Sequence, residues 1–193
     1  MCAISCDPVE THTEWIKDIC AYKSIASGDL GFPIIADNDR EIVTQLGMLD
    51  PDERNAAGLP MPARAVFVVK PNKTLALSIL YPATTGRNFD EILRVVDSLQ
   101  LTANFAVATP ANWSHGGSVM VTPGVKAEEQ EAKFPKGVET VSVPSGKGYL
   151  RITPQPNLPP IEIFDPHFHI WDIRKDEGYA DSTTLFAPAG VSS

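Results

Sequence analysis

The sequence has no apolar run long enough to cross a membrane, and it has few basic residues. No stretch approaches the roughly 18 to 20 uninterrupted apolar residues of a transmembrane helix, and residues 1–3 lack the basic and apolar regions of a secretory signal. The 16 Lys and Arg are outnumbered by 24 Asp and Glu, which gives a formal charge of −8. Nucleic acids and anionic membranes are bound mainly by neutralising their phosphates, so we expect neither as a partner.

Cysteine is also scarce. Only Cys2, Cys6 and Cys20 are present, an odd number without the spacing of a disulfide framework. Free thiols are typical of a reducing compartment, and we therefore expect a cytoplasmic protein. Cys6 stands just before a predicted helix, whose N-terminal dipole would favour its thiolate. The alternative, which we favour, is that Cys6 is a small apolar side chain packed in the interior.

Strand and helix patterns alternate through the first hundred residues and predict an α/β fold. Asp7 is expected at the N-cap and Glu10 at the N3 position of a capping box that begins the first helix, and Gly47 is expected to end the second. Residues 63–69 are apolar and β-branched without alternation, which is typical of a central strand covered on both faces. The predicted elements are strands at residues 3–5, 32–37, 63–69 and 74–81, and helices at 8–22, 40–46 and from 87 or 88 to about 99.

The second half of the chain has a different composition. Most of the 17 prolines follow Thr109, and short strands, Gly/Pro turns and one polar helix at about residues 127–133 predict a small α+β extension. Residues 154–160, with the sequence PQPNLPP, are a stiff segment poor in backbone donors and are the best candidate for a linker. We therefore divide the chain into residues 1–105, residues 106–156 and a tail at residues 157–193.

Ten short segments together carry a family resemblance. They are AIS at 3–5, DPVE at 7–10, FPIIAD at 32–37, LGMLDP at 46–51, ARAVFV at 63–68, LSILYPATTGRNFDE at 77–91, ATP at 108–110, NW at 112–113, FPKG at 134–137 and YLRITPQP at 149–156. The chain resembles the 1-Cys peroxiredoxins, thioredoxin-fold enzymes that reduce peroxides with one catalytic cysteine. The resemblance implies an incomplete thioredoxin-like domain in residues 1–105 and a C-terminal 1-Cys peroxiredoxin domain in residues 106–156. It also implies a peroxide substrate, a thiol reductant and no cofactor.

Two arginines match supporting positions of the family's active site. Arg64 stands where the family has the arginine that contacts the thiolate, because an adjacent cation favours the charged sulfur. From the sequence alone, Arg64 could instead be a strand-end arginine paired with a surface carboxylate. Arg87 resembles a second arginine near the active site, and the alternative is that it stabilises the start of a helix through Asp90.

The family's catalytic cysteine has no counterpart among these residues. The resemblance places that cysteine in a Pro-x-x-x-Thr-x-x-Cys segment before the strand at residues 3–5, and it places one missing strand between the strands at 3–5 and 65–69. We therefore expect the chain to be inactive alone and marginally stable as a monomer. The family dimerises through an edge strand, and the apolar Leu77, Ile79 and Leu80 suit such a homodimer edge. The alternative is that some of these side chains belong to the core on one face of the strand.

The tail departs from the family at about Pro160. Residues 161–172, IEIFDPHFHIWD, place His167 and His169 on one face of a predicted strand, where two imidazoles could share a metal ion. This motif resembles the first strand of a metal-dependent amidohydrolase barrel; the alternative is a disordered tail. His12 and His115 have no partners that spacing identifies and are expected at the surface.

Three interpretations of the whole chain remain at this point. It is an incomplete thiol peroxidase of the peroxiredoxin type, a non-catalytic module that dimerises with a full-length peroxiredoxin, or the front part of a peroxiredoxin–amidohydrolase fusion.

Overall fold

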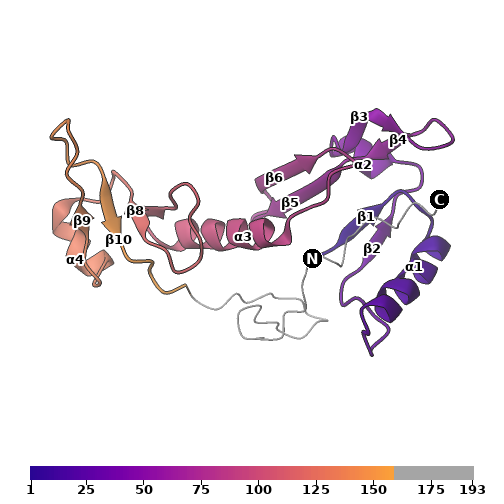
Figure 1. Cartoon of the computed structure of the whole chain (residues 1–193), viewed down its shortest axis with the longest axis horizontal. Helices are drawn as coiled ribbons and strands as arrows, with labels where there is room; N and C mark the ends of the chain where they lie inside the picture. The colour runs from indigo at the N-terminus through magenta and orange to yellow at the C-terminus, as the bar shows by residue number, and fades with distance from the viewer. Residues whose placement is uncertain (159–193) are drawn as a thin grey trace. The chain divides into compact units, whose positions relative to one another are not determined.

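The computed structural model describes residues 1–158, which fold into two compact units (Figure 1). Unit 1 spans residues 1–88, and unit 2 begins at Phe89. No helix in this described part of the chain is both long enough and apolar enough to cross a bilayer. The domain boundaries predicted at residues 105 and 156 stay predictions.

Unit 1 begins with a β-α-β element, as predicted. Strand β1 (Ala3–Ser5) pairs in parallel with β2 (Ile34–Ala36), and helix α1 (Val9–Tyr22) connects them and contacts β2 (Figure 1). The predicted capping box is wrong: Pro8 occupies the N-cap position, and no side chain caps the helix. Asp7 instead accepts a hydrogen bond of 2.8 Å from the Ser5 hydroxyl, because it lies one residue too early to reach the first turn.

Helix α2 (Glu41–Gln45) is short; a buried carboxylate stabilises its N-terminal end, and a glycine ends it. Asp37, only 2% exposed, accepts hydrogen bonds from the N–H groups of Ile42 and Val43 at 3.0 and 2.8 Å. Gly47 ends the helix with φ of +64°, which confirms the predicted stop.

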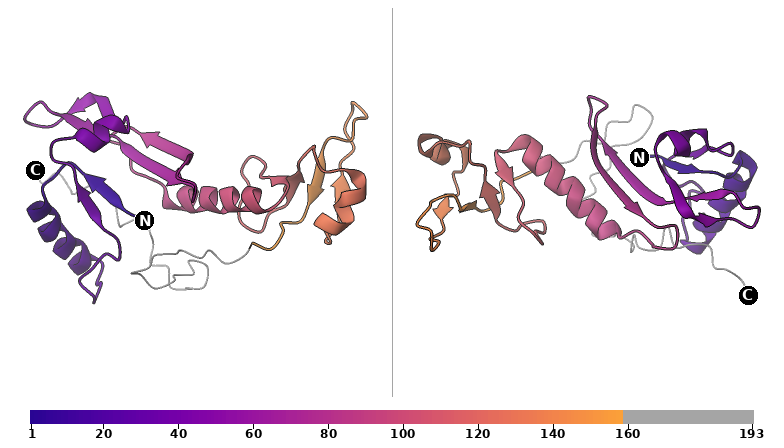
Figure 2. Two further views of the ribbon diagram at one scale, coloured as in Figure 1. Left: turned by 180° about the vertical axis from the view of Figure 1, so that it is seen from behind. Right: turned by 90° about the horizontal axis from the view of Figure 1, so that it is seen from above.

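Two antiparallel hairpins complete unit 1. Strands β3 (Leu49–Arg54) and β4 (Pro60–Pro62) form the first, which the sequence did not predict because its prolines are typical of turns. Strands β5 (Arg64–Val69) and β6 (Leu75–Tyr81) form the second, as predicted, and Figure 2 shows it from behind and from above. The prediction of a central strand at residues 63–69 is wrong in the described structure. Strand β5 pairs there with β6 alone, its first five residues are only half-buried, and Val69 is 59% exposed.

Unit 2 has its own sheet and core. Helix α3 (Phe89–Asn104) precedes a four-stranded antiparallel sheet of β7 (Val107–Ala108), β8 (Val119–Val121), β9 (Glu139–Thr140) and β10 (Arg151–Thr153), in the order β7-β8-β10-β9. The polar helix predicted at 127–133 is a 3₁₀ turn, η1 (Ala127–Glu129), followed by α4 (Gln130–Lys133). Leu101 joins helix α3 to the buried cluster of Val107, Trp113, Val119, Val121, Val125 and Phe134.

Candidate functional site

Arg64 lies at the start of β5, where the hairpin register sets it opposite Tyr81 of β6. Its Nε donates a hydrogen bond of 2.8 Å to the carbonyl oxygen of Ala83, in the loop after β6. Ala83 is itself buried, with 6% of its surface exposed. The guanidinium of Arg64 is therefore tied to a fixed backbone position, and among the described residues it forms no ion pair with a surface carboxylate.

Arg87 lies just beyond that loop and is held by the same hairpin. Its Nε and Nη2 both donate to the carbonyl oxygen of Ala65, at 3.3 and 3.2 Å. Burial lowers the pKa of Arg87 from its usual value, and the positive charge of Arg64 lowers it further. The alternative pairing of Arg87 with Asp90 is absent from the described residues. The structure thus brings the two predicted arginines near each other, where their charges repel and neither forms a salt bridge with a described carboxylate.

A buried carboxylate that the sequence did not single out supports this site. Asp50, 7% exposed, accepts a hydrogen bond of 3.0 Å from the N–H of Ala83 through Oδ2. Its Oδ1 accepts from the N–H groups of Asp52 and Glu53 at 3.0 and 3.2 Å. The bonds from Ala83 and then Asp52 lower the pKa of Asp50 from its usual value. Asp50 therefore positions the residue whose carbonyl oxygen holds Arg64.

The chemical consequence is a local preference for negative charge. Two neighbouring guanidiniums that form no salt bridge stabilise an anion placed beside them, such as a thiolate or a developing oxyanion. The planar guanidinium also suits this role because it stays charged at neutral pH, even with a lowered pKa. The signal that could have found Asp50 is its position before Pro51, since aspartate often bonds the backbone two residues later in such a turn.

Among the described residues, none of the three cysteines forms a hydrogen bond with these arginines. Cys2 is exposed, Cys6 half-buried and Cys20 buried, and all three are free thiols. Burial raises the pKa of Cys6, and the neighbouring charge of Arg40 only partly opposes this. The alternative in which Cys6 is a packed, unreactive thiol is therefore favoured over activation by the helix dipole.

The histidines give no metal site in the described part of the chain. His167 and His169 lie outside the described residues, so metal binding there stays a prediction. Residues 1–158 contain no group of three or more His, Cys, Asp or Glu side chains that could hold a metal ion. His115 lies at the surface as predicted, and its Nδ1 is 3.0 Å from Asp97 Oδ2. The prediction for His12 is wrong, because it is only 4% exposed, and neither of its ring nitrogens has a hydrogen-bond partner within residues 1–158.

Comparison with known proteins identifies the family. The AhpC/TSA family model matches residues 1–78, and the model for the C-terminal domain of 1-Cys peroxiredoxin matches residues 98–137. Peroxiredoxin-6 of Gallus gallus is 62% identical over 157 residues, which make up 81% of this chain and 70% of the relative. Peroxiredoxin-6 of Homo sapiens is 60% identical over 155 residues, or 80% of this chain and 69% of the relative. The chain belongs to the 1-Cys peroxiredoxin family.

Solved peroxiredoxin structures agree with the described fold. A cysteine-to-serine mutant of peroxiredoxin 6 from Arenicola marina has a TM-score of 0.75 and 59% identity, and the match covers 80% of this chain and 70% of that one. A yeast mitochondrial 1-Cys peroxiredoxin has a TM-score of 0.66 and 37% identity, and the match covers 79% of this chain and 69% of the yeast chain. The predicted thioredoxin-like α/β fold with a C-terminal 1-Cys peroxiredoxin domain, and membership of this antioxidant family, are confirmed. These matches give no support to the amidohydrolase resemblance of the tail.

Proposed function

We propose that this chain serves in the thiol-dependent reduction of hydrogen peroxide and organic hydroperoxides, with Arg64 and Arg87 as the cationic side of the active site. The observation that carries the proposal is the uncompensated pair of guanidiniums, each held on a backbone carbonyl of the β5–β6 region. Neither arginine forms an ion pair among the described residues, and the charge of Arg64 lowers the pKa of Arg87, so the two positive charges lie near each other. The proposed substrate is a peroxide, and the proposed reductant is a thiol.

The reaction needs both charges at different moments. A cysteine thiolate attacks one peroxide oxygen, and the O–O bond breaks as the sulfur is oxidised to a sulfenic acid. The other oxygen leaves as hydroxide or alkoxide and then takes up a proton. One reductant thiol then condenses with the sulfenic acid to a mixed disulfide and releases water, and a second reductant thiol attacks that disulfide, which frees the protein thiol and leaves the reductant oxidised as a disulfide. An arginine beside the sulfur stabilises the thiolate, and one beside the breaking bond stabilises the charge on the leaving oxygen.

We further propose that these 193 residues alone do not turn over peroxide. The thiolate must lie beside the arginines, but the charges that act on Cys6 are those of Arg40, Asp37 and Asp7. The test is single-turnover reaction of the reduced chain with hydrogen peroxide, with sulfenic acid trapped and located by mass at Cys2, Cys6 or Cys20. Trapping no faster than on free cysteine is expected. Rapid trapping at Cys6 would instead identify it as a nucleophile.

Fragment complementation tests the arginines themselves. The part of the Gallus gallus relative that precedes the matched region, where the family resemblance places the catalytic cysteine, is supplied as a separate polypeptide, and peroxide consumption is followed with a dithiol. We expect Arg64→Met and Arg87→Met each to lower the restored rate at least tenfold, or about 1.4 kcal/mol in activation free energy. Arg54→Met removes an exposed arginine of β3 and is the matched control. Restored activity that survives both active-site substitutions would contradict the assignment.

A second candidate function is dimerisation without catalysis, either as a homodimer or with a full-length peroxiredoxin. It is favoured by β6, which pairs only with β5 among the described residues and leaves Leu75 and Leu80 each 57% exposed. Sedimentation of the wild type and of Leu80→Glu tests this use of the edge, with Val9→Glu, at an exposed apolar position of α1, as the control. We expect only Leu80→Glu to be monomeric.

The three free thiols support our placement of the chain in the cytoplasm.

A further inference from the structure

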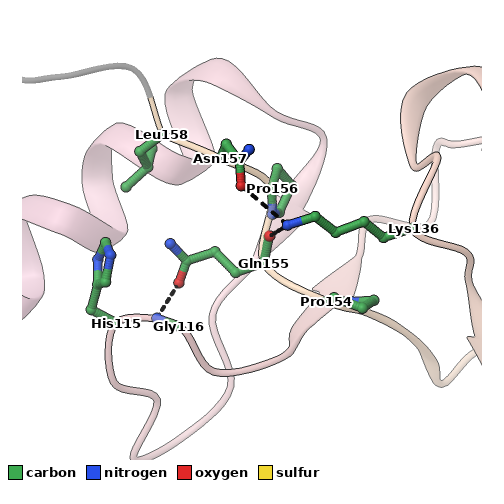
Figure 3. A pocket seen from close by; sticks show the side chains of 8 residues that line it. All are labelled: His115, Gly116, Lys136, Pro154, Gln155, Pro156, Asn157 and Leu158. Atoms are coloured by element: carbon green, nitrogen blue, oxygen red, sulfur yellow. Dashed lines mark hydrogen bonds between the residues drawn. The ribbon is translucent and has the colours of Figure 1, made fainter.

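Unit 2 contains an open pocket of about 410 Å³ that has no part in the proposed peroxide chemistry. Its lining comes from two separate loops and from the last described segment of the chain. The lining residues are His115, Gly116, Lys136, Pro154, Gln155, Pro156, Asn157 and Leu158 (Figure 3). The pocket thus lies where the segment predicted as a linker crosses the surface of unit 2.

Three hydrogen bonds hold this segment in place. Lys136 Nζ donates to the carbonyl oxygen of Gln155 and to Asn157 Oδ1, both at 3.1 Å. The backbone N–H of Gly116 donates to Gln155 Oε1 at 2.6 Å. These bonds also fix the orientation of both amide side chains, because in each the oxygen must face a donor.

The same bonds leave an excess of donors around the pocket. With their oxygens occupied, Gln155 and Asn157 each have a free NH₂ group, and neither nitrogen has an acceptor among the described residues. Figure 3 shows the Gln155 nitrogen directed to the space between His115 and Leu158. Lys136 uses two of its three protons and forms no ion pair with a described residue. The residues that line the pocket therefore include two amide NH₂ groups without an acceptor among the described residues and one positive charge, whose ammonium keeps one free N–H.

We infer that this pocket binds a small oxyanion, a carboxylate or a phosphate group, through Lys136 and the side-chain amides of Gln155 and Asn157. Both groups present several acceptor oxygens and a negative charge, which match the charge and the free N–H groups at the site. The half-buried Pro156 and Leu158 supply an apolar wall for the carbon part of such a ligand. The site is exposed and the chain carries a formal charge of −8, so binding is weak and falls as salt rises.

The test is an NMR titration of the full chain, labelled with ¹⁵N, at constant ionic strength in chloride. Inorganic phosphate and acetate are added in separate arms. We expect saturable shifts of the Gly116 amide and of the Gln155 and Asn157 side-chain NH₂ signals in at least one arm. Saturation by phosphate alone assigns a phosphate ligand, and saturation by acetate assigns a carboxylate.

Matched variants separate the pocket from a general effect of charge. Gln155→Glu keeps an oxygen to accept from Gly116 but removes the NH₂ donor, and we expect it to raise the dissociation constant at least tenfold, or about 1.4 kcal/mol. Gln130→Glu makes the same change on α4 and should alter the dissociation constant less than twofold. Lys136→Met should weaken binding in the same way, whereas Lys133→Met, at a lysine paired with Glu129, should not.

Two results would overturn the inference. One is the absence of saturable shifts at the pocket in both the phosphate and the acetate arm. The other is unchanged binding in Gln155→Glu or Lys136→Met while the indole N–H signal of Trp113, which donates to the Gly117 carbonyl oxygen at 3.0 Å, shows that unit 2 remains folded.

Discussion

Replacing Leu101 by alanine should destabilise unit 2 strongly, because this side chain is the contribution of α3 to a completely buried cluster. Leu101 has 0% of its surface exposed and packs with Val107, Trp113 and Val119. The substitution removes three carbon atoms, and at about 0.8 kcal/mol per buried methylene the lost transfer free energy is about 2.4 kcal/mol. The cavity left behind adds to this, so we expect a loss of about 3 kcal/mol in the free energy of unfolding.

Urea denaturation followed by the fluorescence of Trp113 measures this loss directly. Trp113 is 3% exposed within the same cluster, and the other two tryptophans are replaced by phenylalanine so that only this ring reports. Tyr149→Ala is the control, because Tyr149 is 63% exposed and belongs to the same unit. It should change the free energy of unfolding by less than about 0.5 kcal/mol. A loss below about 1 kcal/mol in Leu101→Ala would refute the view that unit 2 depends on this core.

Two further predictions concern unit 1. The folded pKa of Asp50 lies below its unfolded value of about 3.9, so its carboxylate stabilises the fold above that pH, and the contribution is lost as the pH falls through the folded pKa. The melting temperature should therefore decrease less between pH 7 and pH 3 in Asp50→Asn than in the wild type. At pH 7 itself, Asp50→Asn should be the less stable of the two. Gly47→Ala should cost about 1 to 2 kcal/mol because φ is +64°, while no atom lies within 4 Å of the added Cβ. Gly86→Ala is the control, because it has equal room without a positive φ. Its free energy of unfolding, measured by urea denaturation, should match that of the wild type within about 0.5 kcal/mol.

Local patterns were enough to predict the parts of the fold whose determinants are local. The β5–β6 hairpin and helix α3 follow from apolar spacing and turn residues within a single stretch of chain. The β3–β4 hairpin was not predicted because its strands contain prolines and polar residues, which are typical of loops. These strands are recognised only from their pairing with each other across the turn. The central position predicted for residues 63–69 failed for a related reason: an apolar strand shows that it can be covered on both faces, not which strands pair with it.

For the candidate site, only the family resemblance supplied positions, and the catalytic role of those residues stays a prediction. Arg64 and Arg87 were marked by the motifs around them, and the structure shows that both are fixed by carbonyl oxygens rather than by carboxylates. The position of Asp50 before Pro51 marks only a turn; its link to this site could not be predicted, because the bond to Ala83 joins residues 33 positions apart in the chain. His12 was predicted at the surface because spacing identified no partner for it, but a histidine without such a partner can also be buried, as this one is.

The docking of residues 155–157 onto Lys136 and Gly116 changes how far anything attached after Leu158 can range. As a free polyproline-like spacer, the five residues 154–158 would extend about 15 Å from the sheet and sweep a wide volume. Fastened to unit 2, they contribute none of that reach. A domain, peptide or fluorescent label fused beyond Leu158 is therefore tethered at a fixed origin. Its effective concentration near unit 2 is set only by the residues that follow, and Lys136→Met should lower it by releasing the tether.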